Sequence, residues 1–128
     1  MTANDFINFW RKSSKQDLEV AEDLFRLGHY HYCLFFTHQS IEKLLKGLVY
    51  KNTRTHAAPI HDLVKLAKQA KLQLSKSQVN EFAEMSTWNI RARYDNYKLE
   101  FYKKANRVFT NRWFTKGKEF IKWLESHF

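Results

Sequence analysis

The sequence predicts an all-α fold, an up-and-down bundle of about five helices. Apolar residues recur at helical spacing along most of the chain, and no segment shows a convincing strand pattern. Only 3 glycines and 1 proline interrupt the 128 residues, and such sparse punctuation favours long helices. With 44 % hydrophobic residues, the chain is long enough to bury one core and too short for two ordinary domains, so we expect a single domain over residues 1–128.

The first two predicted helices form a hairpin. The first begins at a cap on Asn4 or Asp5 and runs to about Leu27, where Gly28 supplies the left-handed residue that ends it. The second spans about residues 29–50, and the short connection forces the two helices to lie antiparallel. The residues expected on their apolar sides are Phe6, Phe9, Trp10, Leu18, Ala21, Leu24 and Phe25, then Leu34, Ile41, Leu44, Leu45 and Leu48.

The second half of the chain predicts shorter elements. These are a loop over Lys51–Pro59, a short helix over residues 60–70, a helix ending near Trp88, a segment over residues 89–98 that is either a helix end or a loop, and a last helix or helix pair over residues 100–128. Asp62 is placed near the start of the short helix, and Ser75 or Ser77 caps the next one. The residues expected to face the core are Val79, Phe82, Ala83 and Met85, then Val108, Phe109, Trp113, Phe120, Ile121 and Leu124.

Charge and composition limit the classes of partner. A net charge of +9 can attract RNA, DNA, a nucleotide or an acidic protein. Residues 101–118 hold only basic charges, which form either a solvated helix face or a functional patch, and 16 % aromatic residues indicate an interface.

The single Cys33 excludes an intramolecular disulfide, and we expect no cofactor. Since no signal peptide or membrane-length apolar run is present, we expect a cytoplasmic protein without membrane contact.

Polar side chains interrupt the second predicted helix where it otherwise reads as buried. His38 and Glu42 are four residues apart, so they either bond to each other or touch a common ligand, and they are too few for a metal site. Glu42 and Lys46 have the spacing of a helical ion pair. Lys43 and Lys46 either meet the phosphate of a ligand in a shallow groove or form pairs within the protein.

The segment around Arg91, Arg93 and Tyr94 holds the most attractive candidates for ligand binding. Arginine makes planar, multidentate contacts to phosphate, and tyrosine can stack on a base. The alternative is an arginine that bridges helix ends with the tyrosine packed beneath it. Earlier in the chain, His61 and Asp62 either serve acid–base chemistry or tie a loop and cap a helix.

Taken in order, these residues resemble the HEPN domain family (higher eukaryotes and prokaryotes nucleotide-binding). The matching elements are Trp10, Asp17-Leu18, Ala21, Leu24, Gly28 and Tyr30, then Cys33–Gly47 with His38-Gln39-Ser40 and Glu42-Lys43, then His61-Asp62-Leu63 with Leu66, and Arg91-Ala92-Arg93-Tyr94. The resemblance implies a five-helix bundle that commonly forms homodimers, with a cytoplasmic role linked to nucleotides or RNA. It also implies either a minimal nucleotidyltransferase partner in a toxin–antitoxin-like pair or a metal-independent ribonuclease with an Arg-x(4–6)-His motif.

The chain departs from that family at the ribonuclease motif. The late arginines have no histidine at the required spacing, and the two matches, Arg26 with His31 and Arg54 with His61, fall elsewhere. The resemblance is therefore to members without an evident nuclease motif, and we expect a dimeric module that binds a nucleotide, RNA or a nucleotidyltransferase. Two alternatives stay open: a ribonuclease that uses a non-standard pair, with Arg54 and His61 as its catalytic candidates, or a structural interaction domain with no nucleotide ligand.

Overall fold

The chain folds into helices alone, and the computed structural model describes residues 1–128. In chain order the elements are α1 (Ala3–Arg26), α2 (Tyr30–Thr53), α3 (Leu63–Gln69), α4 (Lys76–Arg91), α5 (Glu100–Lys104) and α6 (Arg107–Glu125). The predicted all-α fold is confirmed, with one element more than expected because the last segment is a helix pair. None of the six helices combines the length and the apolar character that crossing a membrane requires.

Side-chain caps fix several helix boundaries. Thr2 caps α1 in place of the predicted residues, since its hydroxyl accepts from the Asp5 amide and the Asp5 carboxylate accepts from the Thr2 amide. The predicted caps Asp62 and Ser75 are confirmed at the starts of α3 and α4. Beyond α1, Gly28 has a φ of +83°, the left-handed conformation that ends the helix and lets α2 begin at once.

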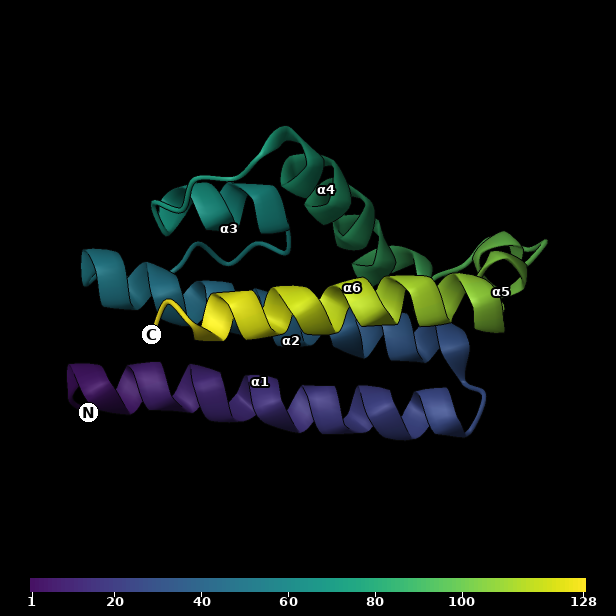
Figure 1. Ribbon diagram of the computed structural model, residues 1–128, viewed down its shortest axis with the longest axis horizontal. Coiled ribbons are helices and arrows are strands. Elements are labelled where there is room, and N and C mark those ends of the chain that lie inside the picture. The colour runs from purple at the N-terminus through teal and green to yellow at the C-terminus, as the bar shows by residue number, and fades with distance from the viewer.

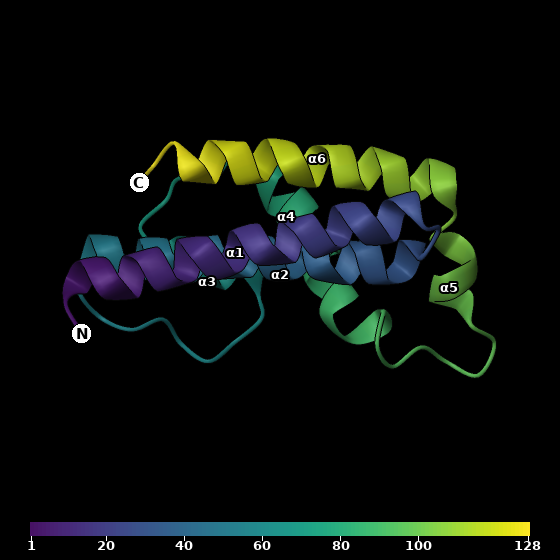
Figure 2. The same ribbon diagram turned by 90° about the horizontal axis from the view of Figure 1, so that it is seen from below.

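Helix α2 is the centre of the bundle. Helix α1 packs antiparallel along one side of α2. Helix α6 packs along another side and runs parallel to α2, from the end of the bundle with the α1–α2 turn to the end with the termini (Figure 1). Both α1 and α6 pack on α2, and their own backbones seldom approach each other, although the Phe25 and Phe114 rings meet between them. Helices α3 and α4 cover a further face of α2, and α5 lies at the end that holds the α1–α2 turn, opposite the two termini (Figures 1 and 2).

The core lies around α2. Its predicted apolar residues Leu34, Ile41, Leu44, Leu45 and Leu48 are all fully buried, together with Phe82 and Trp88 of α4. Three residues expected on the apolar sides of helices are exposed, and Phe9 of α1, 55 % exposed near the end of the bundle that holds the termini, is the first. Ala83 lies beside the inward face of α4, and Val108 lies in the first turn of α6, at the end of the bundle, where little packs over it.

Candidate functional site

The polar side chains of α2 form a network that ties this helix to the loop before α3. Glu42 is buried, with Oε2 3.1 Å from Lys46 Nζ and Oε1 2.7 Å from His61 Nδ1. The predicted pair of Glu42 and Lys46 is therefore confirmed. The predicted bond between His38 and Glu42 is not formed, because His38 Nε2 instead donates to the backbone carbonyl of His61 at 3.0 Å. A buried carboxylate is tolerated only with such partners, and here they hold the loop in place.

His38 is fully buried and is held in one tautomer. Because its Nε2 faces a carbonyl oxygen, Nε2 carries the proton, and Nδ1 is an acceptor without a partner. Burial lowers the pKa of His38, although the charge of Glu42 acts in the opposite direction. The structure places this predicted ligand-binding residue in the core, away from the surface. No group of three or more His, Cys, Asp or Glu side chains is arranged to hold a metal ion.

Lys43 and Lys46, the other predicted binding residues of α2, both form ion pairs within the chain. Lys43 Nζ lies 2.6 Å from Asp17 Oδ2 of α1. Lys46 pairs with Glu42, and its ammonium lies 5.8 Å from the centre of the Trp10 ring. These contacts join α1 to α2, so the geometry supports the pairing alternative for both lysines.

The structure does not bring Arg54 and His61 together. Arg54 is the exposed residue, with a φ of +57°, that ends α2. His61 contacts Glu42, which lies twelve residues before Arg54 on α2. Twelve residues of α-helix span about 18 Å, further than one side chain extends. An Arg–His pair acting on one phosphate needs both groups within hydrogen-bonding reach of it, and this placement does not supply that pair.

Arg91, Arg93 and Tyr94 lie at the end of α4. The Nε and Nη2 atoms of Arg93 both donate to Asn89, to its backbone and side-chain oxygens, at 2.8 Å each. The guanidinium of Arg91 lies over the Phe101 ring at 4.9 Å and has no hydrogen bond within the chain. Tyr94 is 72 % exposed, and the Arg93 guanidinium lies 5.3 Å from the centre of its ring, so an arginine covers only part of the ring. The donors of Arg91 and the remaining exposed surface of the Tyr94 ring are therefore free to meet a ligand.

A shallow cleft of about 440 Å³ opens beside Arg93 and Tyr94. We call it the tyrosine cleft. Its lining residues include His31, Tyr32, Arg93, Tyr94, Leu99 and Tyr102. The ring of His31 lies 4.0 Å from that of Tyr32 and 5.1 Å from that of Tyr102. Sequence reasoning missed these three as site residues. The dense aromatics of residues 29–36 were the available signal, but only the fold places them beside α4 and α5.

The one acid in the tyrosine cleft, Asp95, is occupied by backbone amides. Its carboxylate accepts from the amides of Asn96 at 2.9 Å, Phe101 at 3.2 Å and Tyr102 at 2.8 Å. Desolvation opposes the effect, but these amides and nearby Arg91 lower the pKa of Asp95. The pKa of His31 is lowered too, in this case by burial, and the charge of Asp95 acts in the opposite direction. The cleft therefore offers neutral rings beside arginine, with its single acid engaged in holding α5.

Exposed apolar side chains concentrate around this cleft. Most of the large ones on the protein belong to the α1–α2 turn, the first turn of α2, the end of α4, the α4–α5 segment, α5 or the first turn of α6: Leu27, Tyr32, Ile90, Tyr94, Tyr97, Leu99, Tyr102 and Val108. We call this surface the aromatic end, because the α1–α2 turn, α5 and the start of α6 lie at the end of the bundle opposite the two termini (Figure 1). Lys98, Lys103 and Arg107 lie in the same segments, are exposed and have no ion-pair partner. Exposed aromatic rings among free cations are typical of a binding surface.

Comparisons with known proteins agree with this architecture. The family model described as HEPN domain matches residues 7–127. Among solved structures, the crystal structure of TT1696 from Thermus thermophilus is similar, with a TM-score of 0.79, 18 % sequence identity, and coverage of 95 % of this chain and 98 % of that chain. At this identity the likeness concerns the fold alone. No curated protein matches the chain.

Proposed function

Since the chain belongs to the HEPN domain family, whose domains are related to nucleotides and RNA in a general sense, we propose that it binds a nucleotide or single-stranded RNA at the aromatic end. The observation that carries the proposal is the set of exposed tyrosine rings beside arginine donors without partners. The proposed activity is binding, with no catalytic step.

The tyrosine cleft has the two kinds of group that an unpaired nucleotide needs. Tyr94 and Tyr102 are 72 % and 56 % exposed, and stacking of one base on such a ring contributes about 1–3 kcal/mol. Arg91 retains all of its guanidinium donors, and Arg93 retains those that Asn89 does not use. Bases would stack on the tyrosines while the backbone phosphates meet the arginines.

Fluorescence anisotropy with a 5′-fluorescein-labelled twelve-residue RNA and with labelled AMP tests this proposal. We expect Arg91→Gln and Tyr94→Ala each to weaken binding about tenfold, equivalent to about 1.4 kcal/mol. Tyr94→Phe keeps the ring and should bind like the unmodified chain. Arg54→Gln removes the same charge from an exposed site elsewhere and is the matched control.

Two results would contradict the proposal. Equal weakening by Arg54→Gln and Arg91→Gln would mean that the probes respond only to net charge. Absence of saturable binding at about 0.15 M salt, where surface charges are strongly screened, would favour the structural interaction domain.

We also propose that the chain forms a homodimer in the cytoplasm and pairs with a minimal nucleotidyltransferase in a toxin–antitoxin-like arrangement. The support is its membership of the HEPN domain family, in which such assemblies are common. Native mass spectrometry should give twice the 15.5 kDa of one chain. A monomer at micromolar concentration would contradict the dimer, and failure to co-purify with a co-expressed nucleotidyltransferase encoded beside it would contradict the pairing.

A further inference from the structure

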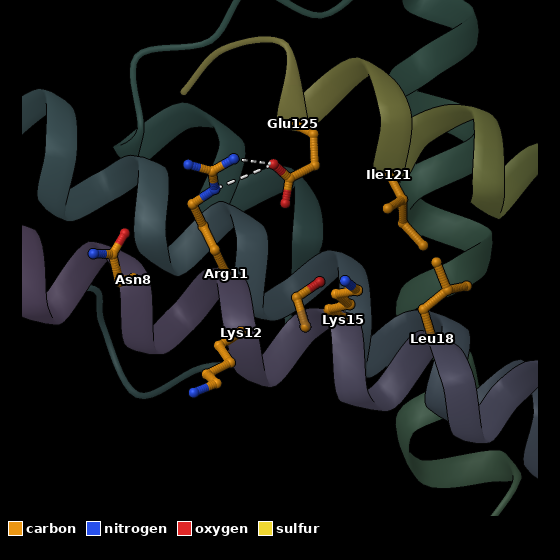
Figure 3. Close-up of a pocket in the computed structure, with 8 residues that line it drawn as sticks. Asn8, Arg11, Lys12, Lys15, Leu18, Ile121 and Glu125 are labelled. Atoms are coloured by element: carbon orange, nitrogen blue, oxygen red, sulfur yellow. Dashed lines mark hydrogen bonds and ion pairs between the residues drawn. The ribbon is translucent and has the colours of Figure 1, made fainter.

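A second concave surface lies along the seam between α1 and α6, toward the end of the bundle that holds both termini (Figures 1 and 3). Both helices pack on α2 while their own backbones stay apart, and an open groove of about 530 Å³ lies between them. We call it the α1–α6 groove. The residues that line it include Arg11, Lys12, Ser14, Lys15, Leu18, Ile121 and Glu125.

The rim of the α1–α6 groove is basic. Arg11 reaches across it, with Nη2 at 2.7 Å and Nε at 3.2 Å from Glu125 Oε2 (Figure 3). Lys12 and Lys15 project from the α1 rim, are exposed, and have no ion-pair partner in the chain. Glu125 is the only acid that lines the groove, and Arg11 already neutralises it. The two lysines therefore present uncompensated positive charge to an incoming group.

The floor of the groove is apolar. Leu18 of α1 and Ile121 of α6 approach each other from opposite sides (Figure 3). Ser14 is buried between them and α2, and its hydroxyl donates to the backbone carbonyl of Ser40 at 2.7 Å. Leu18 is half-buried and Ile121 is 7 % exposed, so the floor presents a small aliphatic surface and leaves no free hydroxyl to be satisfied. It suits aliphatic side chains better than a nucleic-acid base, because no aromatic ring lines it.

We propose that the α1–α6 groove docks an acidic amphipathic helix of a partner protein. The residues that line it on α1 run from Asn8 to Leu18, a span of about 15 Å, which matches about ten residues of a bound helix. The apolar side of that helix covers Leu18 and Ile121, and its carboxylates pair with Lys12 and Lys15. This inference concerns a surface remote from the tyrosine cleft and does not rest on the proposed RNA binding.

The probe is a stapled, fluorescein-labelled twelve-residue helical peptide with leucines on one side and glutamates on the other. Its counterpart carries lysines in place of the glutamates. We expect saturable binding of the acidic peptide alone, measured by fluorescence anisotropy. The double variant Lys12→Glu/Lys15→Glu should weaken binding at least tenfold. Glu125→Gln should strengthen binding several-fold, since it releases Arg11 to pair with the peptide.

The matched control is Lys65→Glu/Lys68→Glu, which makes the same charge change at exposed positions of α3. It should leave peptide affinity within twofold. Equal weakening by both double variants, or absence of saturable binding, would overturn the proposal. Displacement of the peptide by the twelve-residue RNA would also overturn it, because the groove would then belong to a nucleic-acid surface. Loss of a homodimer in Lys12→Glu/Lys15→Glu would assign the groove to a second copy of this chain and would equally overturn it.

Discussion

Replacement of Gly117 by alanine tests how closely α6 approaches α2. A Cβ atom at Gly117 would fall far inside van der Waals contact with the Cγ2 methyl of Thr37. Thr37 is fully buried, and its hydroxyl donates to the Cys33 carbonyl at 2.8 Å. Its methyl can therefore move away only if this hydrogen bond breaks or the two helices separate.

Two opposing effects decide the sign of Gly117→Ala. Helix propensity favours alanine by about 1 kcal/mol. Overpacking costs about 1–3 kcal/mol, and a buried hydroxyl that loses its partner costs about 1–3 kcal/mol more. We expect the steric effect to win, with a loss of about 2 kcal/mol in the free energy of unfolding and a fall of about 8 °C in Tm.

Urea unfolding followed by circular dichroism measures this loss, and a second substitution identifies its cause. Thr37→Ser removes the methyl that the new Cβ would strike and keeps the hydroxyl. In that background Gly117→Ala should be neutral or stabilising by about 1 kcal/mol, as helix propensity dictates. Equal destabilisation in both backgrounds would refute the close approach of Gly117 to Thr37.

Three further outcomes concern buried polar groups. Glu42→Gln should lower the free energy of unfolding by about 3 kcal/mol in urea titrations, because the Lys46 side chain, only 12 % exposed, loses its anion; a loss under about 1 kcal/mol would contradict this. Burial lowers the pKa of His38, so the unfolded state binds a proton that the folded state does not, and stability should fall as the pH drops below about 6.5. His38→Gln should flatten that fall, and an unchanged slope would count against His38 as its source. Burial raises the pKa of Cys33 to about 12, so the native thiol should resist DTNB at pH 8 and react fully in urea; rapid native labelling would contradict its burial.

Local signals explain what the sequence predicts well. The left-handed Gly28 and the caps Asp62 and Ser75 act within a few residues of themselves, so they can be read without the fold. Whether a side chain at the end of a helix is buried is harder to predict. Val108 has the right spacing for the core, but the bundle ends beside it, and no pattern within α6 marks where its neighbours stop.

In the candidate site, too, contacts between residues close in sequence can be predicted, and contacts between distant residues cannot. The pair of Glu42 and Lys46 follows from helical spacing, whereas the contact of Glu42 with His61 joins residues nineteen apart across a loop. In the tyrosine cleft, Arg93 and Tyr94 are adjacent in sequence, but Tyr32 comes from a helix some sixty residues earlier. Such partners depend on helix packing, which periodicity does not specify.

The central place of α2 has a consequence for synthesis and folding. Helix α1 and α2 are neighbours in the chain, so their contacts are of short sequence separation and can form as soon as Thr53 has left the ribosome. The face of α2 that receives α6, marked by Thr37 opposite Gly117, then stays uncovered until α6 has been made. A nascent chain thus exposes this face of α2 to solvent through more than half of its translation. Changes within the hairpin should slow folding, and changes in α6 should mainly hasten unfolding, so the last helix sets the lifetime of the native state.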